Sequence, residues 1–130
     1  MEKRVRGMAI DEEIVQRCRD TLEALARNGE RISYSELAHH LHVANQSVGK
    51  YLNVIYHEEM AAGRPDITVI PHYQESCFGK YNSRGKEPQT ITVDPENPND
   101  VRAYKKELSE VYRVWGGQPK SRLRDWLNKR

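Results

Sequence analysis

Several residue types that mark particular protein classes are scarce in this chain of 130 residues. It has two cysteines, Cys18 and Cys77, which lack the spacing of a zinc site or a disulfide framework. We expect both to be reduced thiols in a cytoplasm, and we expect no cofactor. A single phenylalanine and a mean hydropathy of −0.88 indicate a modest core and a very polar surface.

Long apolar runs are also missing. No stretch is long enough to span a bilayer, so we expect no contact with membranes. The basic arm at 1–9 has no apolar segment behind it, so it does not read as a secretory signal. The length predicts one domain.

Patterns for catalysis are absent as well. The sequence shows no nucleophile–base pair, no carboxylate pair and no phosphate-binding glycine motif. His39, His40 and His42 lie close together, but neighbouring helical residues point about 100° apart, which disfavours a shared metal ion. We therefore expect a binding module and not an enzyme.

The basic residues are clustered, although the net charge is only +2. They form three groups: Lys3, Arg4 and Arg6; Lys80, Arg84 and Lys86; and Lys120, Arg122, Arg124, Lys129 and Arg130. Such clusters on a nearly neutral chain favour a phosphate-facing surface. The alternative is that the basic tails only keep a small domain soluble.

Helical periodicity dominates the first half of the chain. Apolar residues recur three and four apart over 10–28, and Asn28-Gly29 is a typical helix end. A short strand over 31–34 precedes a second helix, for which Ser33 and Glu36 have the spacing of a capping box. A third helix is expected to start at Asn45 or Ser47 and to end at "AAGRPD".

The second half of the chain has strand patterns followed by helical ones. "DITVIPHY" (66–73) and "QTITV" (89–93) alternate like the two strands of a hairpin, joined by a long loop. A fourth helix over 100–115 is expected to be capped by Asn99 or Asp100. A short helix is expected in the tail, anchored by Leu123, Trp126 and Leu127.

This order of elements predicts an α+β fold. It is that of a winged helix-turn-helix, with three helices, a two-stranded β-hairpin wing, and one or two additional C-terminal helices. The expected organisation is a basic arm at 1–9, the winged domain at 10–94, a helix packed on it at 95–117, and a basic tail at 118–130.

Two families resemble this arrangement. The segment "ISYSELAHHL…NQSVGKYL" is similar to the DNA-binding half of alkylguanine-DNA alkyltransferases and their alkyltransferase-like relatives. The matching residues are Tyr34, Leu37, Ala38, Val48, Gly49 and Leu52. That resemblance implies a helix that enters the minor groove, followed by a wing. The reactive Pro-Cys-His-Arg segment has no counterpart, since Pro71 and His72 are adjacent. Alkyl transfer is therefore not expected, and a damage sensor is a lesser alternative.

The second resemblance is to small winged-helix domains of phage, plasmid and restriction-associated proteins. It covers about 32–85 and rests on Tyr34, Leu37, Ala38, Gly49, Leu52, Ile55, Gly63, Pro65, Ile67, Val69 and Gly79. It implies a small regulator from a phage or mobile element that binds double-stranded DNA. The alternative is a phage-encoded inhibitor of a host defence complex, such as a CRISPR effector.

The residues expected to contact DNA lie on the third helix and in the wing. They are Asn45, Gln46, Ser47, Lys50 and Asn53, with Lys80, Arg84 and Lys86. Asn and Gln pair bidentately with adenine, and Lys reaches guanine or a phosphate. Glu58 and Glu59 are expected to repel phosphates, which restricts contact to the first half of the helix. The alternative is that these are ordinary solvated residues.

A protein partner would use a different surface. The aromatic residues Tyr104, Tyr112 and Trp115 share one face of the fourth helix and would form an exposed apolar patch. The same helix is a candidate for pairing two copies in a homodimer. A damage sensor would instead need a pocket beside the third helix for a flipped base.

Overall fold

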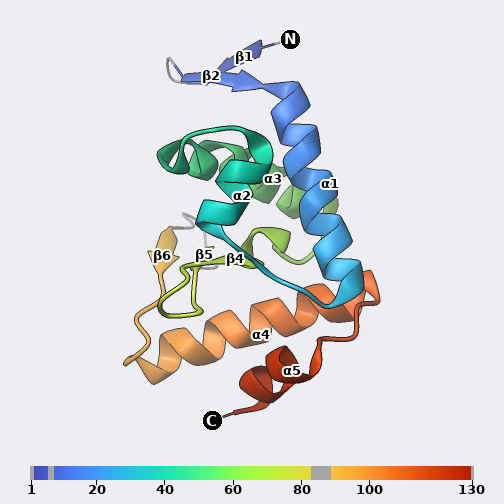
Figure 1. The fold of residues 1–130 in the computed structure, drawn as a ribbon, viewed down its shortest axis with the longest axis vertical. Coiled ribbons are helices and arrows are strands. Elements are labelled where there is room, and N and C mark those ends of the chain that lie inside the picture. Colours follow the sequence, from blue (N-terminus) through green and yellow to red (C-terminus); the bar gives the residue numbers. More distant parts are fainter. Residues whose placement is uncertain (1, 6–7, 83–88, 130) are drawn as a thin grey trace.

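The computed structural model describes residues 2–5, 8–82 and 89–129, with side chains from residue 10 onward (Figure 1). The strands are β1 (Glu2–Val5), β2 (Met8–Asp11), β3 (Ile32–Ser33), β4 (Pro71–His72), β5 (Lys80–Asn82) and β6 (Thr90–Thr92). The α-helices are α1 (Glu12–Asn28), α2 (Tyr34–Leu41), α3 (Val48–Ala62), α4 (Pro98–Trp115) and α5 (Ser121–Asn128). Two 3-10 turns, η1 (Asn45–Ser47) and η2 (Ile67–Val69), complete the described chain, which is α+β with small two-stranded sheets.

The first helix confirms the expected periodicity. Asp11 caps α1 by accepting the Glu13 amide at 2.9 Å, and Gly29 ends it in the left-handed conformation. Its buried residues are Val15, Cys18, Leu22 and Ala26. Before it, β1 and β2 pair in an antiparallel hairpin at the N-terminal end of the molecule (Figure 1).

The second and third helices follow each other across a short turn. The capping box is present, because Ser33 Oγ accepts the Glu36 amide at 3.1 Å and donates to Glu36 Oε1 at 3.0 Å. His42 ends α2 with a positive φ of 58°, a conformation that glycine usually supplies. The Val43 amide donates to the Ala38 carbonyl at 3.0 Å, which closes the turn.

The strand expected over 66–73 is wrong for most of its length. Ile67 to Val69 form the 3-10 turn η2, and all three residues are buried. Asp66 causes this by accepting the Thr68 amide at 3.0 Å and the Thr68 hydroxyl, so this backbone is held in a turn instead of a ladder. Only Pro71–His72 is extended, and it pairs in parallel with β3.

A wing-like hairpin is nevertheless present, made from other residues. β5 pairs antiparallel with β6, with Lys80 opposite Thr92 and Asn82 opposite Thr90. The strand expected at 89–93 is therefore confirmed, but its partner comes from the segment expected to be a loop. The α+β class is shown, and the finer winged-helix assignment is argued under Proposed function.

The C-terminal helices complete the same core as the first three. Figure 1 shows α4 crossing below α2 and α3, with α5 beneath it. Asn97 caps α4 by accepting the Asn99 and Asp100 amides, so the cap expected at Asn99 or Asp100 is wrong. The tail helix is confirmed as α5, and Leu123, Trp126 and Leu127 are half-buried against the core.

The exposed aromatic patch expected on α4 is wrong. Tyr104 is 0% exposed and Tyr112 is 1% exposed, because this face packs onto the rest of the core. Their hydroxyls are used internally, Tyr104 donating to the Val69 carbonyl and Tyr112 to the Glu30 carbonyl at 2.6 Å. Trp115 is half-buried, with the Arg27 guanidinium 5.0 Å from its ring centroid.

Within the described residues, no helix combines the length and the apolar character that crossing a bilayer requires. Both cysteines are free thiols, Cys18 buried and Cys77 exposed. Burial raises the pKa of Cys18 to about 12, so this thiol is a core residue and not a nucleophile.

Candidate nucleic-acid interface

The outward side of α3 carries a polar stripe that begins in η1. Gln46, Lys50, Asn53 and His57 follow one another at spacings of four, three and four, which places them on one helix face. Gln46, Asn53 and His57 are exposed and Lys50 is half-buried. The opposite face buries Val48, Tyr51 and Ile55 in the core, so packing fixes which side of α3 faces solvent.

Asn45 and Ser47 flank the start of this stripe. Asn45 is exposed in η1, and Ser47 is half-buried at the N-cap of α3. The Ser47 hydroxyl makes no capping hydrogen bond, so no side chain caps the first turn of α3. The Val48 amide donates to the Asn45 carbonyl, so η1 continues into α3 and the positive end of the helix dipole lies at the start of η1.

Lys50 stands in the middle of the stripe. Its Nζ lies 5.2 Å from the Tyr51 ring centroid, so the aliphatic stem runs along the helix surface. The Tyr51 ring is buried in the core. The ammonium group is thus held close to the helix.

Gly49 adds a feature that packing does not explain. It is exposed within α3, and a Cβ built on it would meet no atom within 4 Å outside its own helix. Its φ is not in the left-handed region, so no turn requires glycine here. A glycine inside a helix costs about 1 kcal/mol relative to alanine, and one reason to keep it is close approach of a ligand to the backbone.

The hairpin β5–β6 is anchored to the start of α2. The Lys80 amide donates to the Tyr34 hydroxyl at 2.9 Å, while the Lys80 side chain is exposed. Arg84 and Lys86, the other wing residues expected to contact DNA, lie outside the described residues. The Tyr81 hydroxyl donates to Asp100 Oδ1 at 3.2 Å, which ties the hairpin to α4 as well.

The segment before β5 is tightly packed. Phe78 is 8% exposed, and its ring centroid lies 5.0 Å from that of Trp126, so Phe78 fixes this segment to the body of the protein. A Cβ on Gly79 would lie 2.4 Å from the Pro71 carbonyl oxygen and 2.7 Å from the Tyr34 hydroxyl. No other residue has room here, so the wing position depends on Gly79.

The acidic residues of α3 are not the repulsive pair that the sequence suggested. Glu59 is fully buried, where its Oε1 accepts from Arg19 at 2.8 Å and from Arg64 at 2.7 Å. Glu58 is paired with the same Arg19 at 2.7 Å. Burial alone would raise the pKa of Glu59, but the hydrogen bonds from the two arginines outweigh it and lower that pKa. The expectation for Glu59 is therefore wrong, because its charge is neutralised inside the protein.

Local sequence gives no signal for this ion pair. Arg19 lies on α1, 40 positions before Glu59, and no periodicity links them. The helical pattern does place Glu59 on the buried side with Ile55, and that conflict between a charge and an apolar face was the available sign.

Two cavities lie elsewhere on the described surface. The larger one lies between α4 and α5, and a smaller one of about 380 Å³ is lined by Ile32, Ser35, Glu36, His39 and His40. No residue of α3 lines either cavity, so neither is the base pocket expected of a damage sensor. Among the described residues, no three His, Cys, Asp or Glu side chains are grouped to hold a metal ion.

Comparisons with protein-family models, with curated proteins and with solved structures found no significant match. The assignment of a function therefore rests on the geometry of the chain.

Proposed function

We propose that this chain is a non-enzymatic protein that binds double-stranded DNA. In this proposal α2 and α3 act as a helix-turn-helix, α3 is the reading helix, and β5–β6 is the wing. The order α1, β3, α2, α3 and hairpin supports it, as does the polar stripe of α3.

The observation that carries the proposal is the surface around Gly49. A bare stretch of helix backbone lies between Gln46, Lys50 and Asn53, at the end of α3 that no side chain caps. Asparagine and glutamine amides pair with adenine edges, and an ammonium contacts guanine or a phosphate. Without a Cβ at Gly49 the sugar–phosphate backbone approaches the helix more closely than any other residue would allow.

The wing supplies phosphate contacts in this proposal. Lys80 is exposed on β5, and Arg84 and Lys86 follow it in the sequence. Contacts of this kind fix the position of a protein on the duplex without reading its sequence. Their strength depends on salt because each releases bound counterions.

The test is a salt series of binding to random duplex DNA, measured by fluorescence anisotropy. We expect affinity to fall steeply as the salt concentration rises. A Lys50/Arg84/Lys86→Ala variant should bind more weakly, and its plot of log affinity against log salt concentration should be less steep by about 3. Lys120/Arg122/Arg124→Ala is the control with the same loss of charge on exposed residues around α5.

The two variants distinguish binding by α3 and the wing from a general attraction of DNA to basic residues anywhere on the protein. An unchanged slope in the control and a reduced slope in the first variant support α3 and the wing as the contact surface. Equal losses in both variants, or no binding by the wild type at low salt, would refute it.

A further inference from the structure

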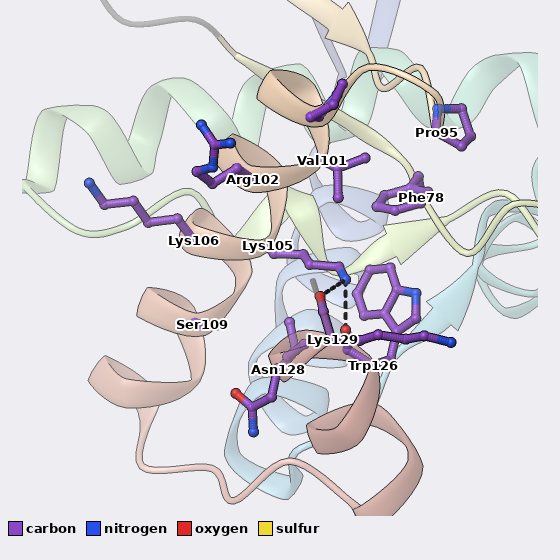
Figure 2. A pocket seen from close by; sticks show the side chains of 12 residues that line it. Phe78, Pro95, Val101, Arg102, Lys105, Lys106, Ser109, Trp126, Asn128 and Lys129 are labelled. Carbon is purple, nitrogen blue, oxygen red and sulfur yellow. Dashed lines mark hydrogen bonds between the residues drawn. The ribbon is translucent and has the colours of Figure 1, made fainter.

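A groove lies between α4 and α5, and its lining residues take no part in the proposed DNA contact. It encloses about 890 Å³ (Figure 2). Its apolar side includes Phe78, Val101, Trp126 and Leu127, and Arg102 and Lys106 stand on its α4 side. We call this the α4–α5 groove. A cavity of this size is in the range of sites that bind a drug-sized ligand or a few side chains.

Lys105 connects α4 to the C-terminal end of α5, the two helices that border the groove. Lys105 Nζ donates to the Trp126 carbonyl at 2.7 Å and to the Lys129 carbonyl at 3.0 Å, as the dashed lines in Figure 2 show. These carbonyls end α5, where a helix has unsatisfied acceptors and a negative dipole end. Lys105 is thus a structural tie, which leaves the other cations of the groove for a ligand.

The charge of the groove has one sign. Arg102, Lys105, Lys106 and Lys129 line it, and none of its described lining residues is acidic. Within the described residues, neither Arg102 nor Lys106 forms a salt bridge, although Arg102 donates to Asn99 Oδ1 at 3.4 Å. Arg113, and to a smaller degree Lys106, lower the pKa of Glu110, so Lys106 lies near one carboxylate of α4 outside the groove lining. Burial, and to a smaller degree the nearby Lys129, lower the pKa of Lys105, so these two cations lie close enough to repel each other. An anionic ligand would relieve that repulsion.

The Trp126 ring in the groove already makes cation–π contacts with two side chains of the protein. Lys105 Nζ lies 4.6 Å and the Arg31 guanidinium 5.3 Å from the Trp126 ring centroid, and Phe78 packs beside it. A stacking platform for nucleic-acid bases needs a free aromatic face. The rest of the apolar lining includes Pro95, Pro98, Val101 and Leu127, which suits an inserted side chain.

We propose that the α4–α5 groove binds an acidic peptide segment of a partner protein, with one large apolar side chain inserted between Val101 and Leu127. The acidic side chains of that segment pair with Arg102 and Lys106 at the rim. Such pairs give orientation and selectivity, while the buried anchor supplies most of the affinity. The proposal is independent of DNA binding, because the groove and α3 share no residue.

The test is a selection from a random peptide library displayed on phage, with the full-length chain as bait. We expect selected peptides to combine Asp or Glu with Leu, Phe or Trp. The most enriched peptide is then labelled with fluorescein and titrated by anisotropy against variants. Arg102→Glu/Lys106→Glu should weaken its binding by roughly tenfold or more.

Two controls sharpen this result. Lys120→Glu/Arg122→Glu makes the same charge change at exposed residues outside the groove, and it should weaken binding by less than about threefold through screened long-range attraction. Leu127→Ser tests the apolar anchor without changing charge. Circular dichroism establishes that each variant is folded.

The possible results either support or overturn binding of an acidic peptide in the α4–α5 groove. Acidic, anchored peptides that lose binding with the groove reversal and with Leu127→Ser support the proposal. Peptides without an acidic excess, or equal losses in both charge reversals, overturn it. It is also overturned if no acidic peptide is selected while an oligothymidylate binds and responds to the groove reversal, since the groove would then belong to nucleic acid.

Discussion

The guanidinium of Arg31 lies 5.3 Å from the centroid of the Trp126 ring, which connects the start of β3 to the C-terminal helix. The same group donates to the Ile70 carbonyl at 3.0 Å and to the Cys77 carbonyl at 2.6 Å. It also donates to the Tyr104 hydroxyl. One side chain therefore joins the start of β3 to the region 70–77, to α4 and to α5.

This hub predicts that Arg31→Lys is strongly destabilising although it keeps the charge. A lysine cannot reach several acceptors with one planar group, so we expect a loss of about 2 kcal/mol in the free energy of unfolding. Urea denaturation measures it. Arg27→Lys is the matched control, since Arg27 also lies over a tryptophan but is exposed. An equal effect in both variants would contradict the role of Arg31.

Gly79→Ala is expected to destabilise the protein by about 3 kcal/mol, because a Cβ there would overlap the Pro71 carbonyl oxygen. The wing would have to move away from Tyr34. Thermal unfolding by circular dichroism gives the size of the effect. A variant as stable as the wild type would show that β5 does not pack against β4 and α2 as described.

Gly49→Ala is expected to have two effects of opposite sign. Stability should rise by about 1 kcal/mol, because the added methyl meets nothing and alanine favours a helix. Affinity for duplex DNA should fall, because the methyl holds the phosphate backbone away from α3. Unchanged affinity with raised stability would count against the close approach that we propose.

Glu59→Gln should lower the free energy of unfolding by about 2 kcal/mol at neutral pH, since it removes the charge that balances two arginines. The pKa of Glu59 is lowered in the folded protein, so its contribution is complete above the ordinary value of 4.5. It is lost as the pH falls through the folded pKa. The difference between wild type and variant should therefore shrink only below about pH 4.5.

Urea denaturation at a series of pH values measures this dependence. Glu110→Gln serves as the control, because Glu110 forms an exposed pair with Arg113 on a single helix. We expect that control to leave stability unchanged. A pH-independent difference for Glu59→Gln would mean that the ion pair is not what stabilises the contact of α1 with α3.

His42→Gly should raise the free energy of unfolding by about 1 kcal/mol, because His42 adopts a positive φ that glycine adopts without strain. Its ring is exposed, so little packing is lost. His39→Gly, in the last turn of α2, should instead destabilise the protein. Thermal unfolding compares the two variants. A larger loss of stability in His42→Gly than in His39→Gly would contradict the assigned turn.

The sequence predicted those elements that depend on residues close together in the chain. The period of α1, the capping box at Ser33 and the stop at Gly29 each depend on residues within a few positions of one another. Pro98 also held a signal that was overlooked, because proline favours the first helical position and so points to Asn97 as the cap.

Features that depend on distant residues could not be read in this way. The run Ile67 to Val69 looks like a strand because every member is apolar or β-branched, but the Asp66 side chain holds it in a turn. The burial of Tyr104 and Tyr112 follows from where α4 packs, which its own periodicity does not state. For the candidate site, the sequence placed Lys50 and Asn53 on the third helix as the structure does, whereas Asn45, Gln46 and Ser47 lie in the 3-10 turn before it. The α4–α5 groove could not be predicted, because it depends on how α5 packs.

The burial of α4 in the common core has a consequence for synthesis. Leu108 and Tyr112 complete a core whose other residues, such as Leu22 and Ile55, leave the ribosome much earlier. The first three helices pack on one another, but the part of the core that α4 covers stays open until α4 is made, and α4 begins at Pro98, 36 residues after α3 ends at Ala62. The chain can therefore bring its first three helices together before α4 is made, and ribosome pausing before α4 would leave the parts of α1 and η2 that α4 covers open to chaperones and proteases.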